Sequence, residues 1–105
     1  MGSYNESFID YTCAIKLDSG LSVAWYNRGS ARFMMQDYSA AINDYSCCIR
    51  LDTACMHAYK YRGIVRIKLN DREEGMRDIS KAKDMGCHID MADLETELSV
   101  NGRPL

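Results

Sequence analysis

The stretch that decides the fold is AWYNRGSARFMMQDYSAAINDYSCCIRLD, residues 24–52, because it returns in altered form 34 residues later. The second copy is AYKYRGIVRIKLNDREEGMRDISKAKDMG, residues 58–86. When the chain is shifted against itself by 34 positions, identical residues coincide at 13 of the positions from 4 to 44, far more than chance gives. The sequence therefore contains an internal repeat with a period of 34 residues.

Apolar residues within a copy follow helical spacing in two separate segments. The first helix is marked by Ala24, Trp25, Ala31 and Met35. The second is marked by steps of three and four through Tyr38, Ala41, Ile42, Tyr45, Cys48 and Ile49. Each copy is thus a helical hairpin whose apolar face is satisfied only when neighbouring copies stack on it.

Acidic residues stand where the second helix of each hairpin should begin. Asp37 precedes one such helix and Asp71 the next, so we expect both side chains to cap free backbone amides. Glu74, three residues after Asp71, completes the pattern of a capping box.

At this point the sequence resembles a known family, the tetratricopeptide repeat. The family's aromatic, glycine, alanine, aromatic and alanine positions are matched by Trp25, Gly29, Ala41, Tyr45 and Cys48. The next copy holds Tyr59, Gly63, Gly75, Ile79 and Ala82 in these places, and the first copy retains Ser7, Tyr11 and Ala14. The resemblance implies an all-α fold, a right-handed solenoid of stacked antiparallel helical hairpins.

The repeat period divides the chain into one domain over residues 4–100, with residues 1–3 a scar of expression or a disordered start. Its expected parts are the second helix of a partial repeat at 4–20, a full repeat at 22–55, a degenerate full repeat at 56–88 and a capping helix at 90–100. The missing first helix indicates a piece of a longer array. Gly75 marks the degenerate copy, because glycine in a helix costs about 1 kcal/mol relative to alanine.

In this family the first helix of each unit lines a concave groove. The resemblance assigns groove positions to Val23, Tyr26, Asn27, Ser30, Phe33, Met34, His57, Lys60, Tyr61, Ile64, Ile67 and Lys68. Large apolar side chains that are exposed beside lysines are typical of a binding surface, and this set includes Phe33, Tyr61, Ile64 and Ile67. We therefore expect an extended peptide or a partner helix to bind there. The alternative is that a neighbouring or capping helix covers part of this face.

One subset of the family grips a C-terminal carboxylate with a clamp of lysines, asparagines and an arginine. Asn27 matches one clamp position, but His57 and Tyr61 stand where the resemblance requires lysine and arginine. We therefore predict that this chain has no such clamp.

Arginine and aspartate also recur with the period of the repeat. Arg28 and Arg62 lie on first helices, and Asp10, Asp44 and Asp78 on second helices. The pattern predicts a structural ladder of ion pairs, with Arg28 bound to Asp10 or Asp44. The alternative is an anion-binding site made of Arg28, Arg32, Arg62 and Arg66.

The five cysteines are odd in number and contain no Cys-x-x-Cys pair, which argues against a disulfide framework and a zinc ribbon. We expect reduced thiols that pack as small apolar side chains in an intracellular, cytoplasmic protein without a metal or other cofactor. The alternative is a metal- or redox-responsive protein that uses Cys55, His57, Cys87 and His88. We predict no enzyme, because nothing else in the sequence converges on either histidine.

Composition restricts the partners. Thirteen basic residues against fifteen acidic ones give a net charge of −2, which is unlike a nucleic-acid-binding protein. No apolar run is long enough to span a membrane. The expected partner is a protein or peptide. The alternative is a homodimer that forms through an exposed face of the first helix, carrying Tyr4, Phe8, Tyr11 and Ile15.

Overall fold

The computed structural model describes the backbone of residues 2–89 and the side chains of residues 9–89. This part of the chain contains α-helices and no strand. The helices are α1 (Gly2–Leu17), α2 (Ser22–Met34), α3 (Tyr38–Leu51), α4 (Met56–Lys68) and α5 (Arg72–Asp84). The predicted capping helix at 90–100 lies outside the described residues.

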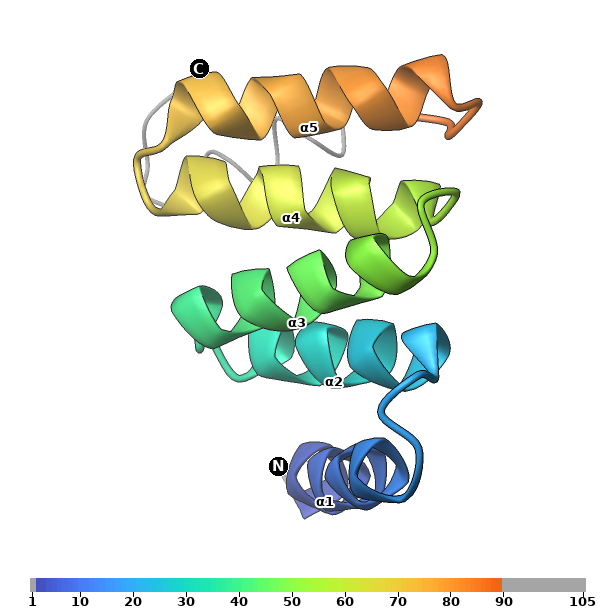
Figure 1. Ribbon diagram of the computed structural model, residues 1–105. Coiled ribbons are helices and arrows are strands. Elements are labelled where there is room, and N and C mark those ends of the chain that lie inside the picture. The colour runs from blue at the N-terminus through green and yellow to red at the C-terminus, as the bar shows by residue number, and fades with distance from the viewer. Residues whose placement is uncertain (1, 90–105) are drawn as a thin grey trace.

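The helices are stacked in chain order, so that each one packs against the next (Figure 1). α2 with α3 and α4 with α5 form antiparallel hairpins, and α1 packs against α2. α2 also contacts α4, which brings the first helices of consecutive hairpins side by side. The all-α solenoid of stacked hairpins predicted from the repeat is confirmed.

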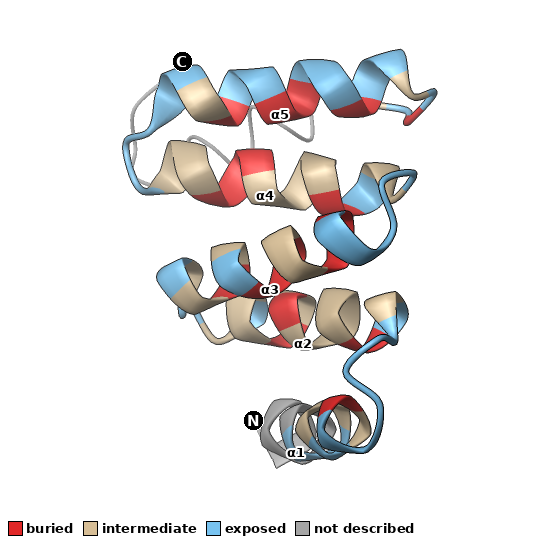
Figure 2. Cartoon of the chain, viewed as in Figure 1, coloured by how far each residue is buried: buried red, intermediate tan, exposed pale blue. Residues whose placement is uncertain are grey.

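The main hydrophobic core lies on α3 and α4, between the two hairpins. It contains the buried residues Ala41, Tyr45, Cys48, Ile49, Ala58 and Val65. Figure 2 shows the buried residues concentrated on the helix surfaces that face neighbouring helices, with the exposed residues on the outside. Since each hairpin contributes only one side of this core, stacking is what removes the apolar faces from water.

α4 and α5 cross at a point where both helices carry glycine. A Cβ atom at Gly75 would lie 2.6 Å from the carbonyl oxygen of Gly63 and 2.5 Å from Cγ1 of Ile67. A Cβ at Gly63 would lie 2.6 Å from the carbonyl oxygen of Gly75. Gly75 therefore permits the close approach of α4 and α5, although glycine lowers the helix propensity at this position.

The tight turn within each hairpin is a Schellman motif. Gln36 has a positive φ of 63°, its N–H donates to the Phe33 carbonyl at 2.9 Å, and the Asp37 N–H donates to the Arg32 carbonyl at 2.8 Å. One repeat later Asn70 has φ 68°, and Asp71 repeats the bond to Arg66 at 2.8 Å. The hairpins thus turn through the same backbone geometry.

The capping prediction needs a correction at the level of the side chains. Asp37 and Asp71 occupy the N-cap positions of α3 and α5, but neither side chain makes a capping hydrogen bond. The same residues end the preceding helix through their backbone N–H groups, in a conformation that differs from the extended one of a usual N-cap. Glu74 accepts a hydrogen bond from Arg77 at 2.6 Å, outside any capping box.

The described part of the chain has no helix that is both long enough and apolar enough to cross a membrane.

Candidate functional site

Two hollows open on the face that α2 and α4 share. The larger, which we call the aromatic pocket, has a volume of about 450 Å³. It is lined by Tyr26, Ser30, Phe33, Met34, Gln36, Tyr38, Tyr45, Tyr61 and Lys68. The smaller, which we call the thiol pocket, has a volume of about 230 Å³ and is lined by Ser22, Val23, Tyr26, Cys48, Asp52, Cys55 and His57. Because Tyr26 lines both, the pockets adjoin and form one groove.

Aromatic rings form the walls of the larger pocket. The ring centroids of Tyr26 and Tyr45 lie 5.8 Å apart, and those of Tyr45 and Tyr61 lie 6.4 Å apart in a stacked arrangement. Phe33 contacts both Tyr38, at 6.0 Å, and Tyr61, at 6.2 Å. Neighbouring rings at these distances attract one another and restrict one another's rotamers, so the pocket is preformed.

The hydroxyl group of Tyr45 is held inside this cluster. Its oxygen lies 3.0 Å from the Ser30 hydroxyl, within hydrogen-bond distance. Burial raises the pKa of Tyr45 well above its ordinary value, and burial together with Tyr61 raises the pKa of Tyr26. Both phenols are therefore neutral at physiological pH and offer hydrogen-bonding groups without charge.

Cations stand beside the aromatic wall. The Lys60 ammonium lies 5.2 Å from the ring centroid of Tyr61, and Lys68 lines the aromatic pocket. An apolar pocket with positive charge beside it can bind an apolar side chain and attract an acidic group next to it.

Of the twelve predicted groove positions, eight line these pockets: Val23, Tyr26, Ser30, Phe33, Met34, His57, Tyr61 and Lys68. Asn27 and Lys60 are half-buried outside them. The expected exposure of Ile64 is wrong, because this residue is only 3% exposed and packs with Ile79 in a second core cluster. Ile67 is half-buried in the same cluster and lies against Gly75 of α5.

Sequence reasoning missed several residues that line the groove. Apart from Ser22, which begins α2, they come from second helices and from turns: Gln36, Tyr38, Tyr45, Cys48, Asp52 and Cys55. The resemblance assigned the groove to first helices alone. The signal that could have found Tyr38 is its place one residue after the N-cap of α3, where a large ring reaches back toward the end of α2.

The comparisons with known proteins agree with this architecture. Residues 22–52 match the tetratricopeptide repeat family. This segment is a tetratricopeptide repeat. Among solved structures, the first TPR domain of Spaghetti (RPAP3) bound to the HSP90 peptide SRMEEVD is similar, with a TM-score of 0.83 and 24% sequence identity. The match covers 97% of this chain and 82% of that one. No curated protein matches the sequence.

The hairpins of this array are held internally by ion pairs. Arg28 of α2 donates from Nε and Nη2 to the two carboxylate oxygens of Asp44 in α3, each at 2.9 Å. Arg62 of α4 binds Asp78 of α5 in the same bidentate way, at 2.9 and 2.8 Å. Both carboxylates are buried. Of the two partners expected for Arg28, the bidentate one in the structure is Asp44. Asp10 is exposed on α1.

Each of these arginines also joins its own hairpin to the preceding helix. Arg62 donates to the Ser46 hydroxyl at 3.1 Å, and Arg28 lies 3.5 Å from that of Thr12, which is the equivalent position one repeat earlier. Each arginine also lies over a ring of its own helix, 5.1 Å from the Trp25 centroid for Arg28 and 5.4 Å from that of Tyr59 for Arg62. The ladder therefore crosses the boundary between units.

The arginines considered for an anion site are drawn into the same clusters. Arg32 lies 3.4 Å from Asp44, and Arg66 lies 2.7 Å from Asp78. Each buried carboxylate thus faces two guanidinium groups, which accounts for their position without an external anion.

The face of α1 proposed for self-association is only partly described. The side chains of Tyr4 and Phe8 lie outside the described residues. Tyr11 is half-buried, and Ile15, expected to be exposed, is 8% exposed and belongs to the core. Among the described side chains of α1, the large apolar ones that are exposed are Ile9 and Leu17. A homodimer through Ile15 is thus unsupported, since α2 packs against this helix.

The candidate metal ligands do not converge. Nδ1 of His57 lies 3.8 Å from Sγ of Cys87, which is buried, while His88 is exposed. Among the side chains that the structure describes, residues 9–89, no group of three or more Cys, His, Asp or Glu is placed to hold a metal ion.

Proposed function

We propose that this chain is a protein-interaction scaffold that binds an extended peptide in the groove formed by the aromatic and thiol pockets. The observation that carries the proposal is the aromatic pocket, whose rings are packed against one another and yet leave a hollow of about 450 Å³. Apolar hollows with a few polar groups are the usual sites for binding a side chain of a partner. The supporting comparison is the similar TPR domain, which is bound to a peptide.

The chemistry of the groove indicates what kind of peptide would fit. An apolar or aromatic side chain would pack among Tyr26, Phe33 and Tyr61. Backbone groups of the peptide would meet the polar side chains of Ser30 and Gln36 at the same wall. An acidic residue next to the anchor would be attracted by Lys68.

The peptide SRMEEVD should bind this chain poorly. His57 and Tyr61 stand where a carboxylate clamp needs lysine and arginine, and a histidine and a phenol supply less positive charge than those residues. We expect calorimetry with SRMEEVD to detect no binding, or binding that does not depend on the terminal carboxylate. Tight binding that is lost on amidation of that carboxylate would refute the prediction that the clamp is absent.

Two matched substitutions test the groove itself. Met34 lines the aromatic pocket and is 60% exposed, whereas Met76 is exposed on α5 and lines neither pocket. Met34→Glu and Met76→Glu therefore add the same charge at exposed helical sites, one inside the groove and one outside. Peptides selected from a random display library against the native chain should bind Met76→Glu normally and Met34→Glu at least about tenfold more weakly, a loss of 1.4 kcal/mol or more.

The control is circular dichroism and thermal unfolding of both variants, which must show that each one is folded. Selected peptides that bind both variants with equal affinity would show that the groove is not the binding surface. Failure to select any peptide would also argue against the groove as a binding surface, because a preformed apolar pocket should capture some sequence in a large library.

A further inference from the structure

Two thiols meet at the boundary between the two hairpins. Cys48 lies in the last turn of α3 and Cys55 is the N-cap residue of α4. The Cys48 thiol donates to the sulfur of Cys55, with the two Sγ atoms 3.1 Å apart. Because the sulfurs of a disulfide are about 2.05 Å apart, a movement of about 1 Å would bring this pair to bonding distance.

The backbone of the α3–α4 turn holds the two residues in this arrangement. The Asp52 N–H donates to the Cys48 carbonyl at 2.8 Å, and the Cys55 N–H donates to the Asp52 carbonyl at 3.2 Å. The Asp52 carboxylate accepts a further bond from the Ala54 N–H at 3.0 Å. These bonds fold the chain back on itself, so the proximity of the thiols does not depend on the rotamers of the two side chains alone.

The two cysteines differ in their access to solvent. Both line the thiol pocket, but Cys48 is buried whereas Cys55 is half-buried. Burial raises the pKa of Cys48 to about 12, so its thiol stays protonated at physiological pH. A small oxidant that enters the pocket therefore reaches Cys55 first, and Cys48 stands behind it as the second thiol.

The other repeats place no sulfur in these positions. The equivalents of Cys48 and Cys55 are Ala14 and Leu21 one repeat earlier, and Ala82 and Ile89 one repeat later. A pair of apolar residues is thus sufficient for this contact in the fold. The central copy alone carries two thiols, which adds a chemical capacity that packing does not require.

We propose that Cys48 and Cys55 are a modification site, at which a small-molecule disulfide such as oxidised glutathione converts the two thiols into one intramolecular disulfide. The Cys55 sulfur, having lost its proton, attacks one glutathione sulfur, the glutathione S–S bond breaks, and the first glutathione leaves as a thiol after taking up a proton. The Cys48 thiol then gives up its proton and its sulfur attacks the Cys55 sulfur, the bond between Cys55 and glutathione breaks, and the second glutathione leaves as a thiol after taking up a proton. Two protein thiols are oxidised and one glutathione disulfide is reduced to two thiols.

The bond would link the end of α3 to the start of α4, which belong to successive hairpins. It would also lie in the wall of the thiol pocket. Oxidation would therefore fix the junction between two units at one end of the groove.

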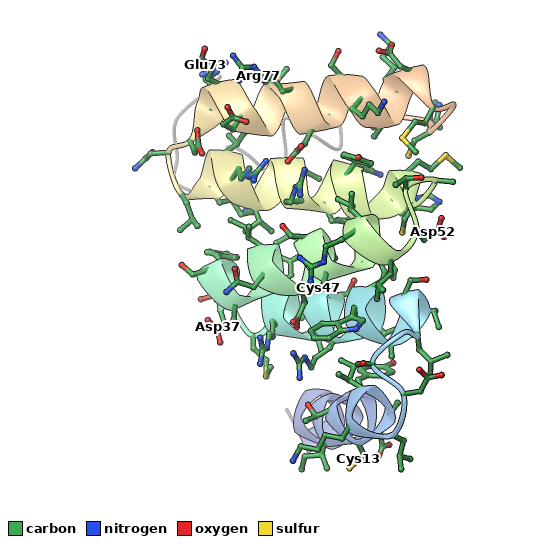
Figure 3. All side chains as sticks on the ribbon, viewed as in Figure 1. Cys13, Asp37, Cys47, Asp52, Glu73 and Arg77 are labelled. Carbon is green, nitrogen blue, oxygen red and sulfur yellow. The ribbon has the colours of Figure 1, made fainter. Side chains whose placement is uncertain are left out.

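The test is disulfide mapping of the native chain. The purified protein is incubated with oxidised glutathione, the remaining thiols are alkylated, and the digest is analysed by mass spectrometry. We expect a Cys48–Cys55 crosslink, a mass lower by two hydrogen atoms and full return of both thiols with dithiothreitol. Cys13 and Cys47, which project from α1 and α3 in Figure 3, serve as internal references and should be alkylated or carry glutathione instead.

The matched control is Cys48→Ala with Cys55→Leu, which copies the Ala14 and Leu21 pair of the preceding repeat. This variant should fold, which circular dichroism checks, and should show no loss of two hydrogens. The single variant Cys55→Ser should also lack the crosslink, whereas Cys47→Ser should retain it. Mapping of the crosslink to Cys47 or Cys87, or a native chain that keeps Cys48 and Cys55 as thiols or as separate glutathione adducts, would overturn the proposal.

Discussion

Arg62 contacts three helices, because it binds Asp78 of α5 and Ser46 of α3 while its guanidinium lies over Tyr59 of its own α4. Arg62→Met should therefore lower the free energy of unfolding by about 2–4 kcal/mol, since a buried carboxylate loses a bidentate partner. The value should fall toward the lower end of this range, because Arg66 remains 2.7 Å from Asp78. Chemical denaturation measures the change.

The control for this substitution is Arg77→Met on the outer surface of α5. Arg77 pairs with Glu73 and Glu74, but its side chain is 65% exposed (Figure 3). Exposed pairs contribute about 0–1 kcal/mol, so Arg77→Met should change the stability little. Equal losses for the two variants would contradict the view that the ladder stabilises the hairpins through its burial.

At Gly75 the packing of α4 against α5 predicts a change in stability opposite to the one that helix propensity predicts. Replacing glycine with alanine inside a helix usually adds about 1 kcal/mol of stability. Here the new Cβ would lie 2.6 Å from the Gly63 carbonyl oxygen, so α4 and α5 would have to separate. Gly75→Ala should therefore destabilise the chain by about 1–3 kcal/mol, as overpacked cores do.

Gly29 provides the comparison, because a Cβ there would lie 3.1 Å from the Tyr45 ring and 3.2 Å from the Asp44 Cβ, both longer than the 2.6 Å approach to a carbonyl oxygen at Gly75. Gly29→Ala should be close to neutral, since the gain in helix propensity offsets a shift of a few tenths of an ångström in the Tyr45 ring and α3. Thermal unfolding of the two variants side by side decides the matter. A stabilised Gly75→Ala would show that the two helices can move apart at little cost.

At the scale of the helices, the sequence located the elements well and their ends less well. The 34-residue period and the apolar spacing placed both helices of each hairpin. The caps were mispredicted because Asp37 and Asp71 follow a residue with positive φ, and the sequence carries glutamine and asparagine there rather than the glycine that signals such a turn. In this turn the aspartate N–H ends the preceding helix, and the aspartate side chain does not cap the amides of the following helix.

This turn geometry predicts the effect of a substitution at Gln36. A non-glycine residue in the left-handed region costs about 1–2 kcal/mol, and glycine avoids that cost while adding about 0.5–1 kcal/mol of unfolded-state entropy. Gln36→Gly should therefore stabilise the chain by up to about 1 kcal/mol, seen as a higher midpoint in urea. Asn70→Gly should have a smaller effect, because asparagine tolerates this conformation better. Destabilisation by Gln36→Gly would contradict the assignment of the Schellman motif.

At the scale of the whole molecule, the groove was predicted in outline because the family resemblance fixes which helices face it. Its depth could not be predicted, since that depends on how second-helix rings such as Tyr38 and Tyr45 pack against α2 and α4. Ile64 illustrates the limit. Its position in the repeat suggested exposure, yet contacts with Ile79 and other apolar residues bury it. Burial of this kind depends on several helices together, and the residues of one helix do not reveal it.

The linear stacking also determines how stability is distributed along the chain. α3 and α4 carry the main core cluster and have neighbours on both sides, whereas among the described helices α1 contacts α2 alone. In a stacked array an end element opens with fewer contacts to break.

Hydrogen exchange under native conditions should therefore be slowest at amides of α3 and α4 such as those of Tyr45 and Val65. Amides of α1 such as that of Thr12 should exchange about 100-fold faster or more, a difference in opening free energy of about 3 kcal/mol. Uniform protection from α1 to α4 would mean instead that the whole array opens as one cooperative unit, and that the ladder through Thr12 and Arg28 couples α1 to the hairpins as firmly as the core couples α3 to α4.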